Sequence, residues 1–182
     1  MSEASPKGDF RAELMADMSG KLLEIEMAVL AEGRKAAKQR LRAKTDKLTN
    51  LFNRRAWDEF AGGEVAAGRQ LGLSHHVFAI DLDTLPQALD DAMIRNAAHA
   101  LQSAMRDSDF LARWGGGEFA ALVMDSPEQS AMRVKARMHS ALRRMNLSGS
   151  IGVEATRQHL TLQEAWTAAE GKMRAERRTP NL

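Results

Sequence analysis

The chain has 182 residues, of which 44% are hydrophobic and 27% charged, so it can bury one core of ordinary size plus an additional segment. It contains no cysteine, which excludes disulfides, cysteine-bound zinc, iron–sulfur clusters and thiol nucleophiles. No apolar run approaches the roughly 20 residues that span a bilayer, and the first residues lack a signal-peptide pattern. We therefore expect a cytoplasmic protein without a membrane span.

The net charge is only +2 at pH 7, although a basic run extends from Arg34 to Lys47. Aromatic residues that could stack on bases are absent from this run, so we interpret it as a solvated helix face. Nucleic acid is accordingly an unlikely partner.

The N-terminal part of the chain divides into a disordered tip at residues 1–8 and a helical segment at residues 9–45. Apolar residues recur in the helical segment at spacings of three and four: Leu14, Met18, Leu22, Ile25 and Val29. They share one helix face, which must be covered by another apolar surface. We expect a homodimer or a protein partner bound through this helix, and the alternative is docking on the chain's own domain.

Helix and strand patterns alternate after residue 46. The elements expected in chain order are a helix at 53–67, a buried strand at 77–83, a helix at 86–105 that begins with Pro86, a β-hairpin at 109–124 with a glycine turn at 115–117, a helix at 128–145, a strand at 148–155 and a helix at 162–178. This order predicts an α+β fold, in which helices flank a central, mostly antiparallel sheet, with an N-terminal helical extension.

Four segments, in this order, resemble the GGDEF family of diguanylate cyclases. They are DKLTNLFNRRAW at 46–57, FAIDLD at 78–83, RWGGGEFAALV at 113–123 and SIGV at 150–153. The resemblance implies a nucleotidyl-cyclase-like fold for a degenerate GGDEF domain at residues 46–182. In that family two domains meet, each presenting one GTP, and two Mg²⁺ ions help to join the nucleotides into cyclic di-GMP.

The resemblance also shows where this chain departs from an active cyclase. Of the two metal-binding acids, one is matched by Asp81, but the third letter of the signature is Gly117, which offers Mg²⁺ no side-chain oxygen. Glu118 follows it, and since side chains alternate along a strand we expect Glu118 to point away from the missing acid. The two positions that read guanine hold Leu89 and Ala98, which cannot hydrogen-bond a base.

These departures predict a protein that is not an enzyme. Asp81 and Glu118 are then relics, with Asp81 the residual candidate for a metal. No cofactor is expected, and Mg²⁺ is needed only if cyclase activity remains. In the last helix, Arg177 stands where the family has a phosphate-contacting lysine.

Many family members also carry an inhibitory product site, marked by R-x-x-D five residues before the signature. Arg106 and Asp109 stand at this offset. An arginine can donate two parallel bonds to guanine O6 and N7, and a carboxylate can accept from the opposite edge. The resemblance adds Arg137 from the following helix and, as a lesser candidate for phosphate contact, Arg113. The alternative is that Arg106 and Asp109 only cap a helix end and form a surface salt bridge.

Three functions remain open at this point. The first is an inactive GGDEF-like domain that binds cyclic di-GMP through its R-x-x-D site and signals by dimer or partner contacts. The second is a weakly active diguanylate cyclase, in which Asp81 and Glu118 hold Mg²⁺. The third is a dimerisation or scaffold module that binds no nucleotide.

Overall fold

The computed structural model describes residues 32, 43–83, 89–159 and 161–178. The chain divides into two compact units, Met1–Ala43 and Lys44–Leu182. The predicted tip at residues 1–8 and nearly all of the helical segment at 9–45 lie outside the described residues. Their predicted disorder and dimerisation therefore stay predictions.

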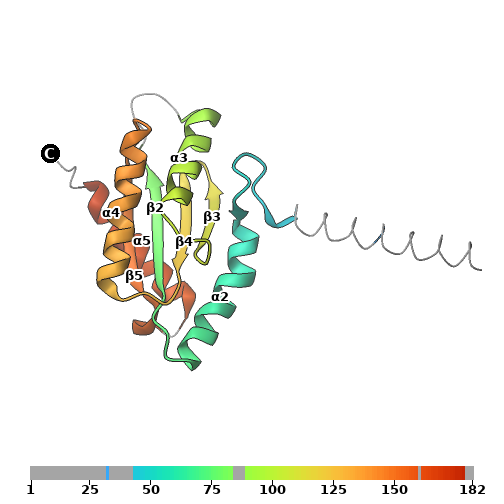
Figure 1. Ribbon diagram of the computed structural model, residues 1–182, viewed down its shortest axis with the longest axis vertical. Coiled ribbons are helices and arrows are strands. Elements are labelled where there is room, and N and C mark those ends of the chain that lie inside the picture. The colour runs from blue at the N-terminus through green and yellow to red at the C-terminus, as the bar shows by residue number, and fades with distance from the viewer. Residues whose placement is uncertain (1–31, 33–42, 84–88, 160, 179–182) are drawn as a thin grey trace, which may run out of the picture. The chain divides into compact units, whose positions relative to one another are not determined.

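The second unit is a five-stranded sheet flanked by helices (Figure 1). Its elements are β1 (Phe52–Asn53), α2 (Arg54–Gln70), β2 (His76–Leu82), α3 (Asp91–Ser103), β3 (Phe110–Gly115), β4 (Glu118–Val123), α4 (Glu128–Arg144), β5 (Gly149–Ala155), the short 3₁₀ helix η1 (Thr156–Gln158) and α5 (Leu162–Arg178). The strand order is β1-β3-β4-β2-β5, and only β1 and β3 are parallel. The predicted α+β class and mostly antiparallel sheet are confirmed.

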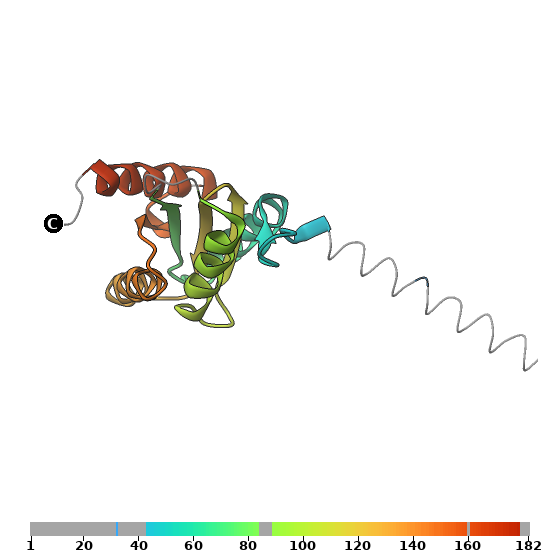
Figure 2. The same ribbon diagram turned by 90° about the horizontal axis from the view of Figure 1, so that it is seen from above.

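Side chains of the interior strand β2, which lies between β4 and β5, alternate between two hydrophobic clusters, one on each face of the sheet. Phe78, Ile80 and Leu82 belong to the cluster under α3 and α4. Val77 and Ala79 belong to the cluster that includes residues of α2 and α5. Figure 2 shows α5 on one side of the sheet, and α3 and α4 on the other. A strand buried on both faces explains why its sequence is a continuous apolar run.

Two details of the predicted elements are corrected. The helix predicted to begin at Pro86 begins at Asp91, after the non-helical residues Leu89 and Asp90. The reason is the Asp90 carboxylate, which accepts a hydrogen bond of 2.7 Å from the Met93 amide and so caps the first turn there. The strand Phe52–Asn53 was not predicted, since two residues are too few to show a period.

Among the described residues, no helix combines the length and the apolar character needed to cross a bilayer.

The close packing of α5 on β5 leads to a prediction. A Cβ atom at Gly152 in β5 would overlap the backbone of α5 at Ala169 and Met173, whereas a Cβ atom at Gly171 in α5 would meet nothing within 4 Å. We expect Gly152→Ala to lower the free energy of unfolding by about 3 kcal/mol, because backbone atoms cannot yield as a side chain can. Gly171→Ala, the matched control, should raise it by about 0.5–1 kcal/mol through helix propensity.

Urea denaturation of both variants and the unchanged protein measures these effects. Equal shifts for the two glycines would contradict the packing of α5 on Gly152.

Candidate functional site

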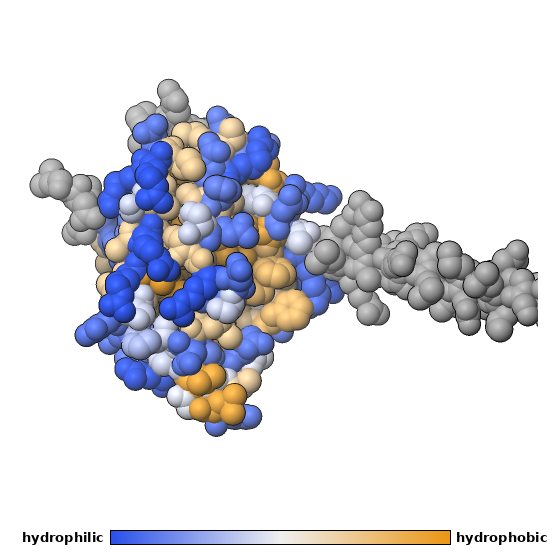
Figure 3. All heavy atoms as spheres, in the orientation of Figure 1, coloured by the Kyte–Doolittle hydropathy of each residue, from blue (hydrophilic) through white to orange (hydrophobic). Residues whose placement is uncertain are grey.

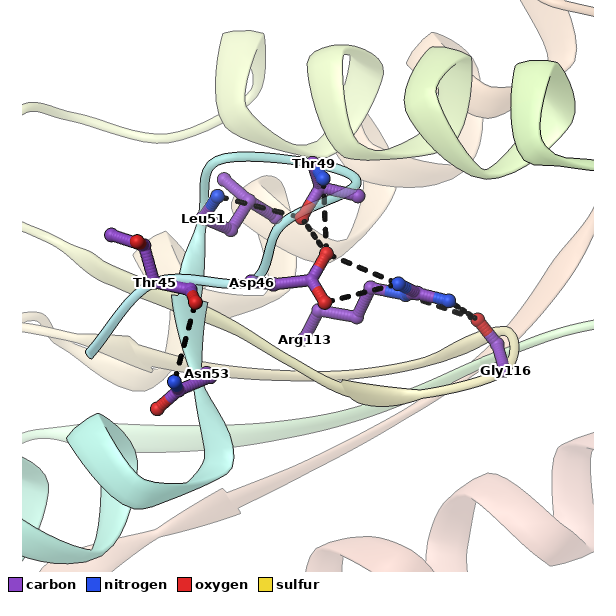
Figure 4. Close-up of polar contacts among 7 residues, drawn as sticks. All are labelled: Thr45, Asp46, Thr49, Leu51, Asn53, Arg113 and Gly116. Carbon is purple, nitrogen blue, oxygen red and sulfur yellow. Dashed lines mark hydrogen bonds and ion pairs between the residues drawn. The ribbon is translucent and has the colours of Figure 1, made fainter. Parts of the chain in front are cut away.

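Arg113 in β3 holds the turn of the β3–β4 hairpin against the segment that precedes β1 (Figure 4). One guanidinium nitrogen donates to both carboxylate oxygens of Asp46 at 3.1 Å, and the other two donate to the Gly116 carbonyl at 3.2 and 3.0 Å. Burial acts to raise the pKa of Asp46, but hydrogen bonds from Thr49 and Arg113 outweigh it and lower that pKa. All three guanidinium nitrogens of Arg113 therefore have partners within the fold.

The two candidate relic acids lie opposite each other in the sheet. Asp81 in β2 pairs with Glu118 in β4, so their side chains leave the sheet on the same face. A Cβ atom at Gly117 would instead point toward Leu82 and Leu89, which belong to the cluster on the other face. Glu118 thus points away from the position of the missing acid, as alternation predicts, but it shares its face with Asp81.

Asp81 already has a cationic partner, which the sequence analysis did not foresee. Arg177 at the end of α5 donates to its carboxylate at 2.6 Å. Burial nevertheless raises the pKa of Asp81; the charge of Arg177 opposes this rise, and the nearby charge of Asp83 adds to it. The only advance signal was the alignment of Arg177 with a phosphate-contacting lysine, which indicated a cation near these acids.

The donor set here does not fit Mg²⁺. Among the described residues, no group of three or more His, Asp or Glu side chains is arranged to hold a metal ion. Mg²⁺ requires near-octahedral oxygen ligation, and here Asp81 is ion-paired while Gly117 supplies no side chain.

Apolar packing occupies the positions that the resemblance assigns to guanine. The Cδ1 atom of Leu89 lies only 2.7 Å from where a Cβ atom would stand at Gly117. Leu89 packs against the core cluster under α3 and α4, and Ala98 of α3, which is 3% exposed, is a member of that cluster. A larger residue at Gly117 therefore requires Leu89 to move.

The R-x-x-D residues form a tight turn after α3. The Asp109 amide donates to the Arg106 carbonyl at 3.0 Å. In return the Asp109 carboxylate accepts from the Arg106 amide at 2.9 Å and from the Met124 amide at 3.1 Å. Asp109 is thereby fixed in place, while the Arg106 side chain is exposed. Within the described part of the chain, the two side chains form no ion pair with each other, but the Asp109 carboxylate does satisfy backbone amides of the turn that follows α3, so the structural alternative is supported in its capping part alone.

Arg137 of α4 reaches the same end of α3. Its guanidinium donates to the Ala104 carbonyl at 3.2 and 2.8 Å, two residues before Arg106. Three of the four residues predicted to bind cyclic di-GMP, namely Arg106, Asp109 and Arg137, therefore lie near the C-terminal end of α3, a region which we call the α3–α4 site. Arg113 lies four residues beyond Asp109 along β3, about 13 Å away by the rise of a strand.

The surface around this site is polar and rich in arginine. Figure 3 shows that hydrophilic residues extend across the face covered by α3 and α4, with hydrophobic groups between them. The exposed arginines of α4 are Arg133, Arg137, Arg143 and Arg144. Asp107, also exposed, lies within the R-x-x-D turn. The excess of guanidinium groups suits an anionic ligand.

Sequence comparison finds a family and its curated relatives. The family model described as "Diguanylate cyclase, GGDEF domain" matches residues 43–181. The chain is 28% identical over 148 residues to the probable diguanylate cyclase DgcJ of Escherichia coli (strain K12), covering 75% of this chain and 30% of DgcJ. It is 31% identical over 111 residues to the diguanylate cyclase DgcP of Pseudomonas aeruginosa, covering 57% of this chain and 16% of DgcP. The chain spans about a third of the length of the first curated relatives it matches.

Solved structures share the fold. The coiled coil and GGDEF domain of DgcB from Caulobacter crescentus, in complex with c-di-GMP, has a TM-score of 0.80 at 20% identity, covering 90% of this chain and 96% of that one. Diguanylate cyclase SiaD of Pseudomonas aeruginosa, in complex with its activator SiaC, has a TM-score of 0.71 at 23% identity, covering 96% and 76%.

The raised pKa of Asp81 leads to a prediction about stability and pH. Because this pKa is higher in the folded than in the unfolded chain, ionisation of Asp81 at neutral pH opposes folding. We expect Asp81→Asn to raise the melting temperature at pH 7. The gain should shrink as the pH falls, and it should vanish below the unfolded pKa of about 3.9, where the carboxyl is protonated in both states.

Thermal melts at several pH values measure this effect. Asp58→Asn, an equal change of charge at an exposed position of α2, controls for net charge. A lower melting temperature for Asp81→Asn at pH 7 would show that the bond to Arg177 outweighs the cost of burial.

Proposed function

The chain belongs to the GGDEF domain family of diguanylate cyclases, and from that premise we propose that it no longer makes cyclic di-GMP but binds it. In this proposal the ligand occupies the α3–α4 site, where Arg106 and Asp109 contact guanine and Arg137 completes the site. The bound state is passed to a second copy or to another protein, and the segment at residues 9–45 is the proposed contact.

The observation that carries the proposal is the contact between Leu89 and Gly117. Because Leu89 Cδ1 approaches to 2.7 Å, an acid side chain at the signature position would require Leu89 to move. Ala98, in a guanine-reading position of the family, is buried with apolar neighbours. Metal ligation and base recognition thus depend on positions that now serve the hydrophobic core.

The α3–α4 site, in contrast, keeps groups suited to a guanine nucleotide. The Asp109 carboxylate is oriented by two backbone amides and still has lone pairs for the N–H groups of guanine. The exposed guanidinium of Arg106 can donate to O6 and N7. Because Asp109 is already fixed, binding requires little ordering beyond the Arg106 side chain, and low ordering cost favours affinity.

Binding of cyclic di-GMP can alter the contact with a second copy or another protein only if the ligand binds two states of the protein with different affinities. Two arginines from different elements, Arg106 in the turn after α3 and Arg137 on α4, would contact one ligand. A ligand held by both favours the arrangement in which they converge.

A second candidate, weak cyclase activity, is favoured by one observation. Asp81 and Glu118 lie opposite each other on the same face of the sheet, so two carboxylates remain near the signature turn. Against it, Arg177 is paired with Asp81, and a further acidic ligand is missing at Gly117.

Titration calorimetry with cyclic di-GMP tests the binding proposal. We expect saturable binding to the unchanged protein and a loss of roughly 10- to 100-fold in affinity for Arg106→Ala, because one bidentate arginine–guanine contact contributes about 1–3 kcal/mol. Arg174→Ala is the matched control. It removes an exposed arginine of α5, on the opposite side of the sheet, and should leave the affinity unchanged.

Thermal shift separates this function from a nucleotide-free scaffold. Ligand at 100 times its dissociation constant stabilises a protein by about 2.7 kcal/mol. No shift with cyclic di-GMP would reject the receptor proposal, and equal affinity of Arg106→Ala and the unchanged protein would reject this site.

A turnover assay tests the loss of catalysis. After long incubation of concentrated protein with GTP and Mg²⁺, chromatography should find no cyclic di-GMP. Gly117→Glu should not restore synthesis. Leu89 and Ala98 still offer guanine no hydrogen bond, and the new side chain also requires Leu89 to move. Product from the unchanged protein, lost in Asp81→Ala, would establish the weak cyclase instead.

A further inference from the structure

A pocket of about 380 Å³ lies where the C-terminal end of α2 meets η1. Its lining includes Arg69, Ser74, Arg157, Gln158 and His159. Volumes from about 300 Å³ upward are typical of small-molecule sites. None of the functions considered above uses this pocket, which we call the η1 pocket.

The charge of the η1 pocket is one-sided. Two of its lining residues are arginines, and none is Asp or Glu. The Arg69 guanidinium donates to the His159 carbonyl, which holds this positive group at the wall, while Arg157 is exposed. A concave surface that carries charge of one sign concentrates ions of the opposite sign.

Glu154, an acid that contacts the lining residue His159, does not cancel the positive charge of the η1 pocket. Glu154 contacts His159 Nε2 at 3.1 Å, but it also pairs with Lys172 at 2.7 Å. Its carboxylate is therefore already matched by a cation from α5. The hydroxyl of Ser74 and the amide of Gln158 add neutral hydrogen-bond donors to the lining.

The walls of the η1 pocket are fixed by backbone bonds. Beyond α2, the Leu73 amide donates to the Gly68 carbonyl at 2.8 Å, across a turn in which Gly72 has φ +70°. The Thr156 amide and hydroxyl donate to the His75 carbonyl at 2.9 and 3.1 Å, joining η1 to the start of β2. Ser74 is held as well, since its carbonyl accepts from the Ser126 amide at 2.7 Å. A pocket formed in this way needs little reorganisation to bind a ligand.

We propose that the η1 pocket binds a phosphate group, either as the free anion or as part of a small phosphomonoester. Arg157 and Arg69 supply charge-assisted hydrogen bonds to the phosphate oxygens, and Ser74 and Gln158 supply neutral ones. This site contains neither Arg106 nor Arg137, and the inference does not depend on binding of cyclic di-GMP.

Amide chemical shifts of the ¹⁵N-labelled full chain test the proposal, with inorganic phosphate, adenosine 5′-monophosphate and uncharged adenosine as probes at constant ionic strength. We expect saturable shifts at Gly72, Ser74 and Gln158 with both phosphate-bearing probes, and none with adenosine. Tighter binding of the monophosphate assigns a phosphomonoester, whereas equal affinities assign the free anion.

Alanine variants test which arginines bind the phosphate group. Arg157→Ala should weaken binding at least about tenfold, because a charged hydrogen bond to phosphate is lost. Arg157 is exposed, so this change leaves the core intact. Arg174→Ala, which lowers the net charge equally but lies outside the η1 pocket, should bind as the unchanged protein does.

Two results would overturn the site: no saturable shift at these amides with either phosphate-bearing probe, or equal affinity for Arg157→Ala and Arg174→Ala. Cyclic di-GMP binding is measured separately on the same variants, so failure of the α3–α4 site remains distinguishable from failure of the η1 pocket.

Discussion

The ion pair between Arg113 and Asp46 joins two segments that are distant in sequence, and the arrangement around the signature turn depends on it. The guanidinium of Arg113 contacts the segment before β1 through Asp46 and the hairpin turn through the Gly116 carbonyl. It is 11% exposed, so losing one partner would leave charge in a poorly solvated place. With the turn fixed, Glu118 stands opposite Asp81 and Gly117 stands beneath Leu89.

Gly117 and Leu89, which are distant in sequence, are linked by one close contact. Leu89 can lie where it does because Gly117 has no Cβ, and a side chain at 117 would collide with it. The contact moves apolar surface of Leu89 out of water, which favours folding.

The sequence was sufficient to predict features that depend on local pattern. The β3–β4 hairpin, for example, follows from its glycine turn. Contacts between residues that are distant in sequence could not be predicted. No local sequence pattern predicts the pairing of Arg177 with Asp81, which depends on how α5 packs on the sheet. The same holds for the approach of Leu89 to Gly117, which depends on how Leu89 packs on the sheet. The start of α3 was misplaced because the Asp90 cap competed with a plausible proline start.

One loop connects the α3–α4 site with the η1 pocket. Three successive backbone amides of this loop make the contacts. The Met124 amide donates to the Asp109 carboxylate, the Asp125 amide donates to His75 Nδ1 at 2.9 Å, and the Ser126 amide donates to the Ser74 carbonyl. The contacts share one end of the sheet because β2 begins where the antiparallel β4 ends. Asp125 has φ +32°, a conformation that non-glycine residues rarely adopt, so the loop is held by its bonds against local strain. A continuous chain of contacts does not by itself make two sites interact. Coupling requires that the loop has two arrangements, and each ligand must then change the affinity for the other by the same factor.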